Sequence, residues 1–154
     1  PDRILEIADQ VPLDVIQLHG DEPPAVLTQL KALPVIRALR LGDDNPTAVL
    51  EYLEASRQLG APVSGVLVDA FEKGSYGGTG KLANWDKARN LSDLIAPCPL
   101  LLAGGLNPTN VAEASRLVGC HGVDVASGVE LQPGQKDAVK TREFVAAARQ
   151  ALGL

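Results

Sequence analysis

The nine residues from Leu100 to Pro108 read Leu-Leu-Leu-Ala-Gly-Gly-Leu-Asn-Pro and contain the features that decide the fold. The three leucines form a short apolar run typical of a buried strand, and Gly104-Gly105 end that run in a turn. Asn107 before Pro108 then predicts a helix start, because an Asn side chain can cap exposed backbone N–H groups and Pro fits the first helical turn. The stretch therefore predicts a strand followed by a helix.

Four other short apolar runs, each bounded by turn residues, predict strands elsewhere. Their near-continuous hydrophobicity is typical of parallel strands that are covered on both faces. The runs are Val15–Leu18, Val35–Leu39, Val66–Val68 and Val123–Val125. Helical patterns cover Asp2–Gln10, Pro24–Leu33, Pro46–Leu59, Trp85–Ile95, Pro108–Val118 and Lys136–Leu152. This alternation predicts a single α/β domain over residues 1–154.

Two architectures fit the alternation, namely a doubly wound open sheet and a closed (βα)8 TIM barrel. In both, ligands bind at the carboxyl ends of the strands, but a doubly wound sheet concentrates its ligand at one switch point. Polar and glycine residues follow all five predicted strands, which favours the barrel. They are Gln17-Leu18-His19-Gly20, Arg40, Asp69, Gly104-Gly105 and Ser127-Gly128.

The composition bounds the class of protein and its partners. With 154 residues, 45% hydrophobic and 21% charged, the chain fits one globular domain. A formal net charge of -5 argues against a nucleic-acid partner. No apolar run approaches the roughly 20 residues of a membrane helix, so we expect a soluble, cytoplasmic protein with no membrane partner. Its two cysteines and two distant histidines indicate no metal site.

The glycine turns at Gly104-Gly105 and Ser127-Gly128 directly follow consecutive predicted strands. Glycine lets backbone N–H groups approach an anion closely, and the last two loops of a barrel commonly hold a phosphate. Either turn alone is better explained as a tight turn that ends its strand. The two turns together, on consecutive strands, favour a phosphate site. We therefore expect a phosphorylated small molecule as ligand.

The segment Gly74–Lys81 resembles a nucleotide-binding P-loop only superficially. The first glycine of that motif would fall at Ser75, and Leu82 stands where Ser or Thr should bind magnesium. Its four glycines instead predict a mobile flap over the rim, or a plain flexible connection.

Asp69 ends its predicted strand just before this flap and is a candidate general acid, since closure over a carboxyl would raise its pKa. An Asp that only binds loop backbone is equally consistent with the sequence. His19 could touch the substrate, but orienting Asp69 or satisfying backbone groups is favoured. Asp124 is expected to line or support the site. His121 precedes the last strand and is expected at the opposite rim, away from the chemistry.

Five segments together resemble the phosphoribosylanthranilate isomerase family of tryptophan synthesis. Each alone is weakly specific, but their joint order covers the whole chain. The segments are Val15–Glu22, Leu67–Asp69 with Gly77–Gly80, Gly104–Val111, Val123–Glu130 and Gly134–Asp137.

The resemblance implies an isomerase that needs no cofactor. It would convert N-(5'-phosphoribosyl)anthranilate into 1-(carboxyphenylamino)-1-deoxyribulose 5-phosphate by an Amadori rearrangement. A general acid protonates the ribose ring oxygen, and a base then takes the C2 proton. By resemblance Asp69 is the acid, His19 lines the site, and two turns hold the phosphate, through Gly104, Gly105, Ser127 and Gly128. We expect His19 and Asp124 to bind the substrate.

One departure from the family concerns its first strand, which reads Lys-Ile-Cys-Gly and carries the base cysteine. Residues 1–154 contain no such segment. Because the His19 strand aligns with the family's fourth strand, we expect an incomplete barrel of about five strands and six helices, the C-terminal portion with strands four to eight. Cys98 and Cys120 each precede a strand, so both are expected at the rim opposite Asp69, as structural residues.

Five strands cannot close such a barrel. We therefore expect a truncated or proteolysed isomerase whose unpaired edges favour self-association or strand exchange. The alternative is an inactive phosphate-binding fragment that has lost the cysteine strand. Another phosphate barrel of tryptophan or histidine synthesis is a third interpretation, against which the segment Gln17–Glu22 argues.

Overall fold

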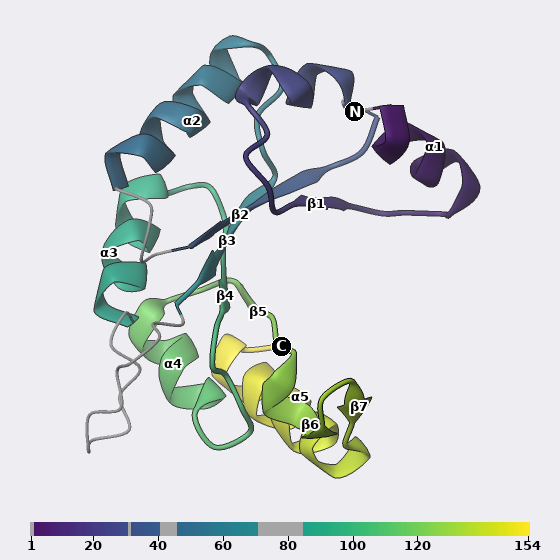
Figure 1. Cartoon of the computed structure of the whole chain (residues 1–154). Helices are drawn as coiled ribbons and strands as arrows, with labels where there is room; N and C mark the ends of the chain where they lie inside the picture. Colours follow the sequence, from purple (N-terminus) through teal and green to yellow (C-terminus); the bar gives the residue numbers. More distant parts are fainter. Residues whose placement is uncertain (1, 31, 41–45, 71–84) are drawn as a thin grey trace.

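The computed structural model describes residues 2–30, 32–40, 46–70 and 85–154 and contains one five-stranded main sheet (Figure 1). All neighbouring strands in that sheet are parallel, and their order follows the sequence. The five predicted strands are confirmed, with ends that shift by one or two residues. They are β1 (Ile16–Leu18), β2 (Val35–Arg40), β3 (Gly65–Asp69), β4 (Leu100–Ala103) and β5 (Gly122–Val123).

The sequential strand order decides between the two architectures. A doubly wound sheet reverses its strand order at a switch point, whereas the order β1-β2-β3-β4-β5 contains no reversal. The helices α2 (Pro46–Gln58), α3 (Trp85–Ile95) and α4 (Val111–Val118) follow one another along the same side of the sheet (Figure 1). This succession of strand and covering helix forms the wall of a (βα)8 barrel.

Two predicted helices differ from the observed elements. In place of the helix predicted from Pro24 to Leu33, the structure has a 3-10 helix, η1 (Pro24–Gln29), in which the Thr28 hydroxyl donates a hydrogen bond to the Ala25 carbonyl and competes with the helical ladder. The helix predicted from Pro108 begins only at Val111. Its first turn is replaced by a loop in which Asn107 Oδ1 accepts hydrogen bonds from the N–H and hydroxyl of Thr109.

The C-terminal region contains a hairpin that was not predicted, and its last residue, Lys136, falls at the start of the predicted helix. A short 3-10 helix, η2 (Ser127–Val129), leads into β6 (Glu130–Gln132), which pairs antiparallel with β7 (Gln135–Lys136). The last helix, α5 (Ala138–Leu152), therefore starts two residues later than predicted. Asp137 caps it, because its Oδ1 accepts the N–H groups of Val139 at 2.7 Å and Lys140 at 3.0 Å.

Alternation along the strands divides the apolar side chains between two layers. Val66 and Val68 of β3 and Leu100 and Leu102 of β4 pack against helices α2 to α5 and are fully buried. Residues of opposite parity, Ala38, Leu67 and Ala103, form a smaller cluster on the inner face. Asp69 has the same parity as Leu67, so its carboxyl belongs to the inner face.

The first helix, α1 (Asp2–Gln10), lies at the β1 edge of the sheet, at the far right in Figure 1. It has no buried residue, and Ile4 alone packs in part against the cluster around Ile16 and Leu18. Among the residues that the structure describes, no helix is long and apolar enough to cross a bilayer.

Candidate functional site

A cavity of about 300 Å³ lies at the carboxyl ends of β3, β4 and β5. It brings together residues that the sequence analysis singled out on three separate strands. Both glycine turns and both candidate carboxylates contribute to its wall. These residues are Asp69, Gly104, Gly105, Asp124, Ser127 and Gly128.

Asp69 is the last residue of β3, and its strand register explains how it reaches the cavity. Its Cα pairs with Ala103 of β4 on one side and with Arg40 of β2 on the other. The side chain is half-buried on the inner face. The predicted flap, residues 74–81, lies outside the described residues, so closure over this carboxyl stays a prediction.

Asp124 lies just beyond β5 and not within the strand as predicted. Its N–H still bonds the Leu102 carbonyl of β4 at 2.9 Å, so the backbone continues the sheet by one more step. The side chain is exposed, whereas its neighbours Val123 and Val125 pack against the helix layer. Asp124 therefore lines the same cavity as Asp69, with a side chain that is exposed to solvent.

The turn after β4 is fixed by two asparagines and two glycines. Gly104 and Gly105 have positive φ angles of 91° and 64°, which favour glycine. Asn110 accepts a hydrogen bond from the Asn107 N–H at 2.8 Å and donates from Nδ2 to the Gly105 carbonyl at 3.1 Å. Asn107 was expected from the sequence as a helix cap, whereas Asn110 was not singled out and belonged only to the family segment.

Gly128 is the point at which the two turns touch. A Cβ atom placed on Gly128 would overlap the carbonyl oxygen of Leu106 and come within 3.1 Å of the Asn107 Cα. No side chain fits between the two backbones. The contact between the turns thus requires a glycine at this position, independently of any requirement that a ligand imposes.

His19 lies in a neighbouring cavity of about 280 Å³ that is lined also by Asp21, Arg37 and Arg40. It follows β1, and β2 lies between β1 and β3. His19 therefore faces the same rim as Asp69 but does not line the cavity that contains Asp69 and the glycine turns.

A partly buried ion pair between Arg37 and Glu22 stabilises the loop that carries His19. Glu22 Oε2 accepts hydrogen bonds from Arg37 Nη1 at 2.7 Å and from the Gly20 N–H at 3.0 Å, and the Arg37 guanidinium lies 5.1 Å from the ring centre of Tyr52. Burial alone would raise the pKa of Glu22, but the hydrogen bonds and the Arg37 charge outweigh burial and lower it. These contacts were not predicted from the sequence, because the residues that form them lie on three different elements.

The remaining candidates lie at the amino ends of the strands, as predicted. His121 Nδ1 accepts a hydrogen bond from the Leu100 N–H at 3.3 Å, which ties the start of β5 to β4. Cys98 is half-buried and Cys120 buried, and burial raises the pKa of both thiols. These cysteines are therefore protonated at neutral pH and remote from Asp69.

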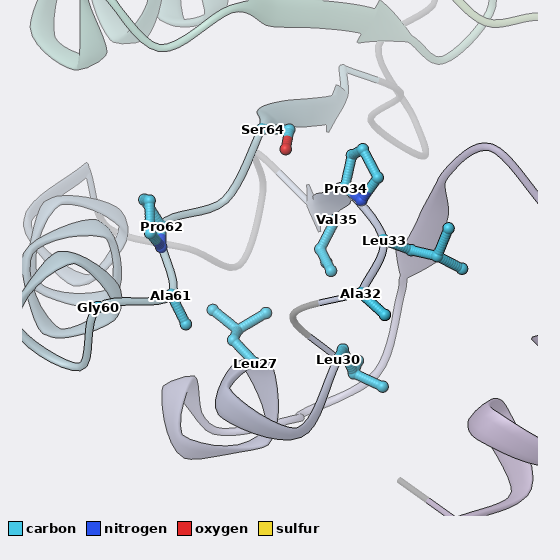
Figure 2. A pocket seen from close by; sticks show the side chains of 10 residues that line it. All are labelled: Leu27, Leu30, Ala32, Leu33, Pro34, Val35, Gly60, Ala61, Pro62 and Ser64. Atoms are coloured by element: carbon cyan, nitrogen blue, oxygen red, sulfur yellow. The ribbon is translucent and has the colours of Figure 1, made fainter.

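A cavity of about 400 Å³, lined mostly by apolar side chains, also lies at this amino-terminal rim. Figure 2 shows Leu27 of η1 facing Ala61 across it, and among the described residues that line it Ser64 alone carries a hydroxyl group. Binding sites combine an apolar wall with several convergent polar groups. Among the described residues that line this cavity no such group of polar side chains converges, so it resembles a packing gap.

Comparison with known proteins gives a consistent family. The family model described as "N-(5'phosphoribosyl)anthranilate (PRA) isomerase" matches residues 1–147. The N-(5'-phosphoribosyl)anthranilate isomerase of Roseiflexus sp. (strain RS-1) is 51% identical over 149 residues, which are 97% of this chain and 65% of the relative. The corresponding protein of Pelobacter propionicus is 44% identical over 96% of this chain and 65% of its own length.

Solved structures agree with these relatives. A crystal structure of phosphoribosyl anthranilate isomerase from Thermotoga maritima has a TM-score of 0.75 at 33% identity, and covers 97% of this chain and 68% of that one. A second such isomerase, in complex with reduced 1-(o-carboxyphenylamino)-1-deoxyribulose 5-phosphate, has a TM-score of 0.73 at 30% identity over 97% of this chain and 66% of that one. The chain thus spans about two thirds of the length of the proteins it matches.

Proposed function

The chain belongs to the N-(5'-phosphoribosyl)anthranilate isomerase family, and from this premise we propose that the protein catalyses the Amadori rearrangement of N-(5'-phosphoribosyl)anthranilate in tryptophan biosynthesis. The observation that carries the proposal is the single cavity lined by Asp69 and by both glycine turns. A related isomerase binds a phosphorylated product analogue. The cavity combines a carboxyl group with a glycine-rich wall, which is the pairing that such a substrate requires.

In the proposed reaction Asp69 is the general acid. The substrate phosphate binds the backbone of Gly104-Gly105 and Ser127-Gly128, which directs the ribose ring toward the end of β3. Asp69 then donates its proton to the ring oxygen, and the ring opens. The carboxylate that remains is half-buried on the inner face, where it can stabilise the iminium charge that develops on the substrate nitrogen. Asp124 and His19 are proposed to contact the substrate from either side.

The second step removes the C2 proton and requires a base. The family's base is the cysteine of a Lys-Ile-Cys-Gly segment, which residues 1–154 do not contain. Cys98 and Cys120 precede β4 and β5, at the far ends of the strands, so neither can reach the proton. We propose that residues 1–154 form a single domain with strands four to eight of the barrel, to which the base comes from another strand.

Turnover measurements test this division of roles. Isomerase activity is followed by the loss of anthranilate fluorescence, for residues 1–154 alone and with an added peptide that carries the family's first three strands. We expect turnover only with the peptide. Turnover by residues 1–154 alone would contradict the base assignment, and no turnover in either mixture would contradict the proposed function.

Replacement of the acid gives a sharper prediction. In the complemented protein, Asp69→Asn should lower kcat by about 10²- to 10⁴-fold, which is the usual contribution of a general acid. The matched control is Asp93→Asn, which removes an exposed carboxyl on α3. A kcat for Asp69→Asn within about threefold of the parent would exclude Asp69 as the acid.

Three expectations about cellular context stay predictions from the sequence. They are a cytoplasmic location, the absence of nucleic-acid and membrane partners, and self-association through the sheet edges.

A further inference from the structure

Lys136 ends β7 and reaches back to the cavity wall. Its Nζ donates hydrogen bonds to the Ala126 carbonyl oxygen at 2.7 Å and to Glu130 Oε1 at 2.9 Å. Ala126 is one of the residues that line the cavity beside Ser127 and Gly128. The hairpin lysine therefore holds the backbone of this wall from the outside.

Two further hydrogen bonds stabilise the same region but have other acceptors. Lys140 Nζ donates to the Glu130 carbonyl at 2.8 Å, and the Asp137 N–H donates to the Val129 carbonyl at 2.8 Å. Neither of these acceptors lines the cavity. Of the three hydrogen bonds, only the one from Lys136 to Ala126 has an acceptor that lines the cavity. The effect of Lys136 on a ligand can therefore be separated from general stabilisation of the hairpin.

The geometry of the peptide group explains how the hydrogen bond from Lys136 to Ala126 can control the cavity wall. In a planar trans peptide the carbonyl oxygen and the following N–H point in opposite directions. Holding the Ala126 carbonyl toward the hairpin therefore fixes the orientation of the Ser127 N–H. Ala126 has φ -113° and ψ -85°, which belong to neither helix nor strand. No regular ladder of hydrogen bonds supports this residue, so the lysine provides the support.

The charge of Lys136 is balanced locally. Glu130 accepts the ammonium hydrogen bond, and this bond lowers the pKa of the Glu130 carboxyl, which therefore stays ionised at neutral pH. The net field of the pair in the cavity is small. The effect of Lys136 on a ligand should consequently come from the position of the Ala126–Ser127 peptide.

From these contacts we infer that Lys136 is a positioning residue for the substrate phosphate, which acts through the Ala126 carbonyl on the wall formed by Ser127 and Gly128. The inference rests on the proposed function, since that function assigns the phosphate to this wall. It predicts that a lysine on the outer hairpin controls phosphate affinity without touching the ligand.

Three variants of the complemented protein test the inference, with inorganic phosphate as the probe in calorimetric titrations. Lys136→Met keeps the length of the side chain but removes the donor. Lys136→Arg restores a cationic donor, and Lys140→Met removes the neighbouring tie, which does not end on the cavity wall. Thermal unfolding is measured for each variant, and KM and kcat are measured separately for phosphoribosylanthranilate.

We expect Lys136→Met to weaken phosphate binding and to raise KM by about tenfold or more, since a hydrogen bond from a charged donor contributes about 1.5–3 kcal/mol. Its kcat should change little, because Asp69 is untouched. Lys136→Arg should recover most of the affinity, and Lys140→Met should bind phosphate like the parent.

Two results with the variants would overturn the inference. One is phosphate binding by Lys136→Met that equals binding by the parent, and the other is an equal loss in Lys140→Met, which would reduce Lys136 to a support of the hairpin. A parent that turns over substrate but binds no phosphate would also overturn it while leaving the proposed function intact. A parent that binds phosphate without turnover would contradict the proposed function alone.

Discussion

Gly128 is the residue at which the two turns of the cavity touch, and its replacement by alanine tests that contact. The added Cβ would overlap the Leu106 carbonyl, so the backbone must shift. We expect Gly128→Ala to lower the free energy of unfolding by about 1–3 kcal/mol, as overpacking does, and to weaken phosphate binding. Chemical denaturation measures the first effect.

The control for this substitution is Gly122→Ala. A Cβ there would meet the Leu101 side chain at 3.5 Å, an ordinary contact distance. A Gly128→Ala variant as stable as Gly122→Ala would show that the turns can separate without cost, contrary to the packing argument.

Glu22 gives a pH prediction at the same scale. Its pKa is lowered from 4.5 in the folded protein, so its stabilising contribution is fully present above the unfolded-state value. That contribution is lost as the pH falls through the lowered folded-state value. Glu22→Gln should lose about 1–2 kcal/mol at pH 7, because Arg37 keeps a weaker acceptor, and should lose less below pH 4.

Denaturation curves at pH 3 and pH 7 measure this difference, with Glu143→Gln on the exposed face of α5 as the control. A loss at Glu22 that is the same at both pH values would contradict the role of the ionised carboxylate.

At the scale of elements, the sequence predicted the strands and the strand-end residues well, because buried strands depend on local apolar runs. It failed where a short polar segment decides the structure. Residues 127–137 form a 3-10 turn and a hairpin because Gly134, with a φ of 81°, reverses the chain. Lys136, on β7, then bonds residues up to ten positions earlier. A helical pattern in sequence carries no signal of such contacts.

The capping of α5 gives the prediction for this scale. Asp137→Ala removes the acceptor for the first N–H groups of the helix, those of Val139 and Lys140. We expect the midpoint of thermal unfolding to fall by about 2–4 °C, followed by circular dichroism. Asp137→Asn, which can still cap, should recover most of the loss. An unchanged midpoint for Asp137→Ala would mean that α5 is fixed by packing alone.

The whole molecule shows why strand order and rim chemistry could be predicted together. Polar residues at the ends of five strands favoured a barrel, and the sequential parallel order agrees. The separation of His19 from the cavity with Asp69 was not predictable, since it depends on how β2 spaces the ends of β1 and β3 along one rim. The brace of Glu22, Arg37 and Tyr52 was equally hidden, because no local pattern relates residues on different elements.

The sheet edges give the prediction at this scale. Within the described part of the chain, β1 pairs with β2 alone and β5 with β4 alone. We expect residues 1–154, as an isolated polypeptide, to sediment with a mass above 16.1 kDa that rises with concentration. Val15→Lys, which places a charge beside the β1 edge, should reduce this association. A compact monomer at every concentration would contradict the expectation.

The two ends of the barrel wall differ in one further respect that matters for engineering. The carboxyl-end rim contains the candidate acid and the glycine turns, whereas the amino-end rim contains the His121 tie, both thiols and the apolar cavity. Substitutions that fill the cavity between Leu27 and Ala61 lie a full strand length from Asp69. Variant libraries for thermal stability and for altered substrate range can therefore be built on separate sets of residue positions and combined afterwards. The free-energy changes caused by substitutions at distant sites usually add.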